Sequence, residues 1–181
     1  MIRIFLIASL IISNFTLAEY TNSNGKALEK PFKDLIKWVR SDVKPKLAQI
    51  DVSSEWQTIN LNEADNYIIW IGHSTFLIKK EGIAILTDPV FSDRASPFKN
   101  VGPERLIPPA MSIDQLPKID FVTVSHNHYD HLDINSLKQI SKLHSEAIFF
   151  VPIGDGKLLK RKRIKNVYEF NWWESYSIEG F

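Results

Sequence analysis

One short stretch of the sequence concentrates side chains that bind metal ions. Residues 125–133 are Ser-His-Asn-His-Tyr-Asp-His-Leu-Asp and hold three of the five histidines of the chain. The four potential ligands in this stretch are His126, His128, Asp130 and His131. Imidazole and carboxylate groups together suit zinc, with manganese or iron as alternatives. Residues 125–133 are therefore the first candidate for a metal-binding site.

The spacing indicates how these ligands would be presented. Residues 121–124 (Phe-Val-Thr-Val) directly precede the cluster, and their β-branched and aromatic side chains predict a buried strand. Side chains two positions apart in an extended chain point to the same side, so His126 and His128 can face one ion together. A turn just beyond them could aim Asp130 and His131 at a second ion.

Packing alone explains this cluster poorly. An isolated histidine is ordinarily a core or surface residue whose ring nitrogens are satisfied by neighbours. Burying three histidines and an aspartate together without a partner would cost several kcal/mol. The pattern HxHxDH after an apolar strand therefore predicts a metal site, or the remains of one.

A further carboxylate lies at the end of another predicted strand. Residues 67–71, 74–79 and 83–87 predict three strands in quick succession. The third strand stops at Pro89, because proline cannot donate a hydrogen bond to a neighbouring strand. Asp88 is thus left at a strand end. A carboxylate there suits the support of a metal-bound histidine, and an ordinary turn aspartate is equally compatible with the spacing.

Other elements are predicted around the cluster. Apolar residues recur at helical spacing after Pro31, and this helix either packs on the domain with a solvated basic face or rests on an anionic membrane surface. Residues 91–117 predict a long loop, in which Arg94 and Arg105 are either solvated or meet an anionic substrate. Asp133 is the expected N-cap of a helix.

The remaining predictions lie toward the end of the chain. The patterns predict a short helix after Asp133, with Ile134, Leu137 and Ile140 on its packed face. They also predict a strand over 147–151, a helix or loop over 154–165 and a last strand over 167–170. The segment 154–165 is rich in lysine and arginine. These basic side chains either form a solvated face or contact phosphate or lipid headgroups.

Composition limits the class of protein. The chain has 181 residues, of which 44% are hydrophobic and 24% charged, typical of one ordinary globular domain. A formal net charge of +1 argues against capture of nucleic acid by bulk electrostatics. The absence of cysteine excludes a disulfide framework and cysteine-ligated zinc.

The start of the chain predicts export. Arg3 precedes an apolar run from Ile4 to Ile12, and Thr16-Leu17-Ala18 resembles a cleavage site, so residues 1–18 are a predicted signal peptide. An uncleaved membrane anchor is the alternative. We expect a leader with the amphipathic helix over 19–64 and the main domain over 65–181. The mature chain would then be secreted or periplasmic, with association to a membrane as an open possibility.

Several motifs together resemble a known family. The HxHxDH cluster resembles the metallo-β-lactamase superfamily. Further stretches are similar to its N-acyl-phosphatidylethanolamine-hydrolysing phospholipase D branch, which lies near the ascorbate-phosphate lactonase-like enzymes. These stretches are Ile71-Gly72-His73-Ser74-Thr75, Thr87-Asp88-Pro89-Val90-Phe91, Arg94-Ala95-Ser96-Pro97, Gly102-Pro103, Phe150-Val151-Pro152-Ile153-Gly154 and Asn171-Trp172-Trp173-Glu174. The resemblance covers about residues 65–175.

The resemblance implies a fold and a site. The fold would be a mixed α/β, four-layer αββα sandwich with two zinc ions at one edge. His126 and His128 would bind the first zinc, and Asp130 and His131 the second, with Asp88 in support. Asp130 would also orient the attacking hydroxide and act in catalysis. The implied substrate is N-acyl-phosphatidylethanolamine, cleaved to an N-acylethanolamine and a phosphatidic acid.

The sequence departs from this family in one large respect. The family pattern continues past the tryptophan pair and supplies further ligands, whereas the only histidine after His131 is His144, inside a predicted helix. We therefore expect roughly the N-terminal half of the sandwich, with one face of its sheet uncovered. Such a chain would be weakly active alone and would gain activity from a complementing C-terminal chain or a homodimer.

Two other functions stay open at this stage. The same cluster suits a lactonase-like hydrolase of a small anionic substrate. An inactive half-domain that binds a partner chain is the alternative outside enzymes. No substrate-binding residue is assigned from the sequence.

Overall fold

The computed structural model describes residues 32–40, 51–98 and 100–177. The chain divides into two units, Met1–Gln49 and Ile50–Phe181. In the first unit the described element is helix α2 (Phe32–Arg40), at the position predicted after Pro31. The predicted signal peptide lies outside the described residues and stays a prediction. Among the described helices, none combines the length and the apolar character needed to cross a membrane.

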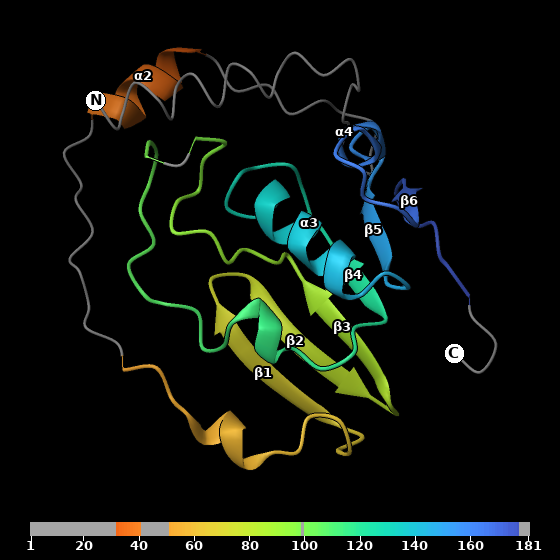
Figure 1. Ribbon diagram of the computed structural model, residues 1–181. Helices are drawn as coiled ribbons and strands as arrows, with labels where there is room; N and C mark the ends of the chain where they lie inside the picture. Colours follow the sequence, from red (N-terminus) through yellow and green to blue (C-terminus); the bar gives the residue numbers. More distant parts are fainter. Residues whose placement is uncertain (1–31, 41–50, 99, 178–181) are drawn as a thin grey trace. The chain divides into compact units, whose positions relative to one another are not determined.

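The second unit is built on one six-stranded sheet with the strands in chain order (Figure 1). The strands are β1 (Tyr67–Gly72), β2 (Thr75–Lys80), β3 (Ile83–Thr87), β4 (Phe121–Thr123), β5 (Ile148–Pro152) and β6 (Val167–Phe170). Each lies within one or two residues of the strand that the alternation of apolar side chains predicts. Strands β1 to β3 are antiparallel hairpins, and β3 to β6 run parallel.

The parallel half of the sheet decides where the candidate site lies. Thr87 of β3 pairs with Thr123 of β4, which pairs with Phe150 of β5. The carboxyl ends of these strands therefore meet at one edge. Asp88 and the histidine cluster both follow directly from that edge.

Helices and loops connect the parallel strands. The long segment between β3 and β4 contains the short 3-10 helix η2 (Ile113–Gln115). Helix α3 (Ile134–Leu143) connects β4 to β5, and α4 (Gly156–Arg161) connects β5 to β6. Another 3-10 helix, η1 (Glu55–Thr58), precedes β1. The basic side chains around α4 are exposed to solvent.

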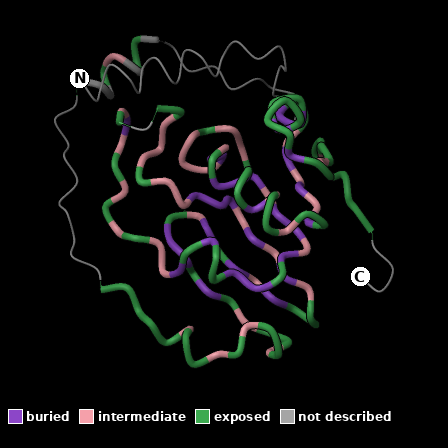
Figure 2. The backbone as a smooth tube through the Cα atoms, in the orientation of Figure 1, coloured by how far each residue is buried: buried purple, intermediate pink, exposed green. Residues whose placement is uncertain are grey.

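The core lies between one face of the sheet and helix α3. Leu77, Leu86, Val122 and Phe149 stand side by side across four strands, and each is at most 1% exposed. Leu137 and Ile140 of α3 belong to the same cluster of buried apolar residues. Buried stretches of the chain are purple in Figure 2. Trp56 and Leu61, which the sequence analysis placed in the leader, pack against this core.

The opposite face of the sheet is apolar and partly open. Ile68 is 71% exposed and Trp70 is 49% exposed, and both alternate with the buried Ile69 and Ile71 along β1. Tyr168 of β6 is also exposed, at 46%. Among the described residues, the sheet is thus covered well on one side and incompletely on the other.

Helix α3 begins where the sequence predicted, and its cap can be tested. The Asp133 carboxylate accepts hydrogen bonds from the backbone N–H groups of Asn135, Ser136 and Ser92 and from the Ser136 hydroxyl. Asp133→Ala should lower the free energy of unfolding by about 1–3 kcal/mol, because it removes the cap and leaves Ser92 N–H without this acceptor. Urea unfolding measures the change. Asp114→Ala removes an exposed aspartate and should stay within about 0.5 kcal/mol; equal losses in the two variants would contradict the assignment.

A second prediction concerns pH. Burial lowers the pKa of His144 below its ordinary 6.5, and its Nδ1 accepts a 3.4 Å hydrogen bond from the Ile119 backbone N–H. His144 is therefore protonated more readily in the unfolded chain than in the folded one. The free energy of unfolding consequently decreases as the pH falls from 6.5 toward the lowered pKa of His144 in the folded chain. His144→Gln does not titrate, so its urea midpoint should fall less between about pH 7.5 and about pH 5. Parallel profiles for the two proteins would refute this.

Candidate metal centre

The first two predicted ligands lie close enough to share an ion. His126 Nε2 and His128 Nδ1 are 3.2 Å apart, with ring centroids 4.6 Å apart. Two nitrogens bound to one tetrahedral zinc at the usual distances are about 3.3 Å apart. This pair therefore has the separation that a common ion requires. Both side chains follow from β4, as the alternation argument expected.

The second predicted pair is placed by a tight turn. The backbone N–H groups of His131 and Leu132 both donate to the His128 carbonyl, at 3.0 and 2.7 Å. This turn brings His131 Nε2 to 3.8 Å from Asp130 Oδ2. It also brings the His131 ring beside that of His126, with ring centroids 4.0 Å apart and the ring planes tilted by 43°. All four predicted ligands consequently gather at one edge of the sheet.

Asp88 supports this cluster from the end of β3. Its carboxylate, on a residue only 7% exposed, accepts hydrogen bonds from the Ser125 backbone N–H and hydroxyl, at 2.6 and 2.8 Å. The same carboxylate lies 2.8 Å from His131 Nδ1. That contact places the ring proton on Nδ1 and leaves the lone pair on Nε2, the arrangement of a metal-binding imidazole held by a carboxylate.

The electrostatics of the cluster favour neutral imidazole. Burial lowers the pKa of His126, and the neighbouring rings of His131 and His128 lower it further, against smaller opposing effects of Asp130 and Asp88. Neutral imidazole is the form that binds a metal. The arrangement therefore suits cation binding near neutral pH without a cost for removing a proton from His126.

The structure adds one histidine that the sequence analysis did not assign. His73 lies in the turn between β1 and β2, and its Nε2 is 3.4 Å from Asp130 Oδ2. Ligand atoms of His73, Asp130 and His131 all lie within 4.8 Å of one another. His73 stood inside one of the motifs behind the family resemblance, but spacing along the chain gave no reason to place it beside Asp130.

The two loop arginines bind carbonyl groups of the loop itself. Arg94 donates to the Gly102 carbonyl and pairs with Glu104 at 2.9 Å. Arg105 donates to the carbonyls of Val90, Ser92 and Ile107, and burial lowers its pKa against the opposing effect of nearby aspartates. Both guanidinium groups thus stabilise the conformation of the loop between β3 and β4.

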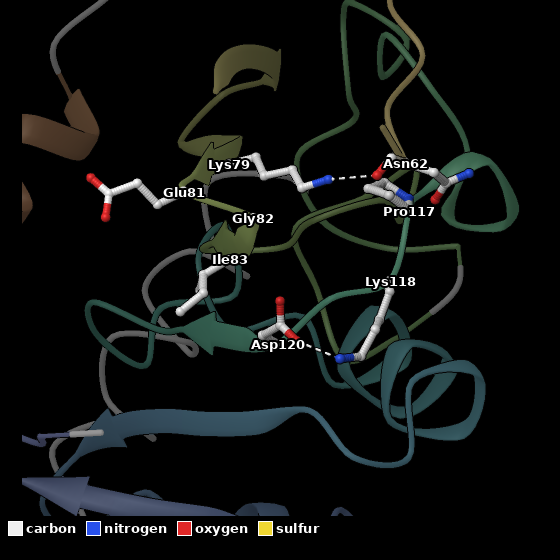
Figure 3. Close-up of a pocket in the computed structure, with 8 residues that line it drawn as sticks. All are labelled: Asn62, Lys79, Glu81, Gly82, Ile83, Pro117, Lys118 and Asp120. Carbon is white, nitrogen blue, oxygen red and sulfur yellow. Dashed lines mark hydrogen bonds and ion pairs between the residues drawn. The ribbon is translucent and has the colours of Figure 1, made fainter. Parts of the chain in front are cut away.

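A hollow of about 440 Å³ lies at the other edge of the sheet (Figure 3). Its polar groups bind one another. Lys79 Nζ donates to the carbonyls of Leu61 and Asn62, and Lys118 pairs with Asp120 at 2.9 Å. Lys79, Lys118 and Asp120 therefore have partners within the protein, and the hollow lies away from the histidine cluster.

Comparison with known proteins assigns the family. Residues 67–181 match the family described as the "Beta-lactamase superfamily domain". The chain belongs to the metallo-β-lactamase superfamily. This confirms the family resemblance and the mixed α/β fold class that the motifs predicted.

Two individual relatives are similar to this chain at the level of sequence. Over 119 residues the chain is 43% identical to N-acyl-phosphatidylethanolamine-hydrolyzing phospholipase D 1 of Caenorhabditis elegans, covering 63% of this chain and 33% of that protein. It is 38% identical over 113 residues to the mitochondrial enzyme of the same name from Saccharomyces cerevisiae, covering 62% and 24%. The chain thus spans about a third or less of the length of these curated relatives.

A solved structure also resembles this member of the superfamily. Isothiocyanate hydrolase from Delia radicum gut bacteria aligns with a TM-score of 0.48 and 18% sequence identity, covering 60% of this chain and 43% of that one.

The role of Asp88 gives the prediction for this site. Asp88→Asn should weaken zinc binding about 10–100-fold, because the amide no longer stabilises the Nδ1–H tautomer of His131. Competition with a chromophoric chelator measures the affinity. Asp120→Asn is the matched control, since Asp120 also accepts a backbone N–H, from Ala84, but at the other end of β4. Equal zinc affinities of Asp88→Asn and the wild type would show that Asp88 does not support the metal centre.

Proposed function

We propose that this chain carries the metal-binding part of a zinc-dependent hydrolase that cleaves a phosphodiester in the manner of a phospholipase D. One observation carries the proposal: two pairs of donors, His126 with His128 and Asp130 with His131, gather at one sheet edge beside the buried carboxylate of Asp88. The similarity to the two named phospholipases supports a phosphodiester substrate.

Each residue has a definite task in this proposal. His126 and His128 would hold the first zinc and Asp130 and His131 the second, while Asp88 fixes the ring of His131. Zinc bound there would lower the pKa of a water molecule, so that a nucleophile is available at neutral pH, and would offset the charge on the phosphate. Asp130, whose side chain is 46% exposed, orients the attacking water and takes its proton.

The reaction consumes one water. Its oxygen attacks phosphorus, and the bond between phosphorus and the N-acylethanolamine oxygen breaks. The proton goes to that leaving oxygen, which gives N-acylethanolamine and phosphatidic acid. A lactonase-like hydrolase of a small anionic substrate uses the same donors, so the substrate assay has to separate the two functions.

Partners and location belong to the same proposal. The exposed basic side chains around α4 support contact with an anionic lipid surface. The exposed Ile68 and Trp70 support a complementing chain, a second copy or a further segment over this sheet face. A secreted or periplasmic location rests on the signal peptide predicted over residues 1–18.

The function can be tested with zinc-loaded protein. We expect hydrolysis of N-acyl-phosphatidylethanolamine in vesicles that is weak alone, rises when the C-terminal segment of a complete relative is added, and is lost with a chelator. Asp130→Asn should reduce the rate about 10²–10⁴-fold, and Asp114→Asn should not. Bis-(4-nitrophenyl) phosphate and a simple lactone serve as alternative substrates. Hydrolysis of the lactone alone would replace the phospholipase by the lactonase function, and rates indifferent to chelator and to Asp130 would refute both.

A further inference from the structure

His73 lies where a third donor to the second ion would have to lie. It comes from the β1–β2 turn, far along the chain from the loop after β4 that carries Asp130 and His131. Its Nε2 is 3.4 Å from Asp130 Oδ2, and its ring centroid is 5.2 Å from that of His131 in an edge-on arrangement. Two separate parts of the fold thus aim three donor atoms at one small volume.

The distances fit a shared ion. Donor atoms around a tetrahedral zinc are about 3.3 Å apart, and those of His73, Asp130 and His131 are 3.4 and 3.8 Å apart in two pairs and within 4.8 Å in all. Asp88 binds His131 through Nδ1, so the Nε2 of His131 is the atom left to face the other two donors. Three protein donors and one open position are what a catalytic zinc usually has.

An ion pair alone explains this arrangement poorly. The side chains of His73 and Asp130 are 49% and 46% exposed. An exposed pair of this kind contributes little to stability, roughly 0–1 kcal/mol. It gives no reason for holding a bulky residue in an unfavourable backbone conformation.

The backbone of His73 is held in such a conformation. Its φ is 50°, in the left-handed region that non-glycine residues rarely adopt. The indole N–H of Trp70 donates a 2.8 Å hydrogen bond to the His73 carbonyl and fixes the turn. Strain of this type persists where surrounding contacts impose it, and it gathers at functional sites.

We propose that His73 is a protein ligand of the second metal ion through Nε2, together with Asp130 and His131. This rests on the proposed metal centre and extends it. The second ion then has three donors from the described chain and keeps one position for water, whereas the sequence alone assigned it only two.

The role of His73 as a ligand can be tested by measuring bound metal, without an activity assay. The full chain is stripped with chelator and dialysed against Zn²⁺, and bound metal is measured by elemental analysis. We expect two ions in the wild type. In His73→Gly, a titration of bound metal against Zn²⁺ should show the affinity of one site lowered at least about 10-fold and the other unchanged. Glycine tolerates the positive φ, so the turn should keep its shape.

Two further variants make the result specific. His73→Glu has a carboxylate oxygen with about the reach of the His73 Nε2 and should recover most of the second ion. His144→Gln also loses an imidazole, but one that lies away from the cluster and binds the Ile119 backbone N–H, and it should keep both ions. Substitution with Co²⁺ should show the loss of one ion in His73→Gly as a changed visible absorption spectrum.

The outcomes separate this inference from the function it rests on. Two ions held with unchanged affinity by His73→Gly would overturn the role of His73 and leave the proposed function intact. Equal weakening of both sites, with no recovery in His73→Glu, would also overturn it, because His73 would then act on the fold of the turn. A wild-type chain that binds no ion would refute the metal centre itself and the ligand with it.

Discussion

The buried carboxylate of Asp88 is the contact on which the candidate centre depends. It lies at the end of β3 and accepts hydrogen bonds from the backbone and hydroxyl of Ser125, which begins the loop after β4. The Asp88 backbone carbonyl binds the Thr75 hydroxyl, so β2 is tied to the same point. Charged hydrogen bonds in a dry environment are stronger than neutral ones and hold their partners in a narrow geometry. Asp88 thereby joins the start of β2, the end of β3 and the loop after β4, and its carboxylate holds the ring of His131.

Local patterns along the sequence were sufficient for much of this arrangement. Alternating apolar residues predicted the strands, and Pro89 predicted where β3 ends. Asp133, whose carboxylate can cap a helix, predicted the start of α3. The HxHxDH spacing identified the candidate donors of the loop after β4, since that loop is a continuous piece of chain. All of these signals are carried by residues close to one another in sequence, where the period of the backbone determines which side chains share a face.

What the sequence left open depends on contacts between distant segments. His73 meets Asp130 only because the sheet order brings the β1–β2 turn to the edge from which the loop after β4 emerges. The roles of Arg94 and Arg105 likewise depend on which carbonyl groups the long loop folds toward them. A pattern of residue types can show that a guanidinium is present, but the length and path of the loop decide whether it faces substrate or backbone. Here the carbonyls of Val90, Ser92 and Ile107 bind Arg105.

Two of the six non-glycine residues with positive φ in the described part of the chain lie at the candidate centre. His73 and Asp88 both have positive φ, 50° and 36°, although neither is glycine, and both side chains approach His131. Glycine, asparagine and aspartate adopt this conformation most readily, so His73 is the less usual of the two residues. Retaining an imidazole there costs stability in the fold without a bound ion. A cation that joins His73 to Asp130 and His131 would offset that cost.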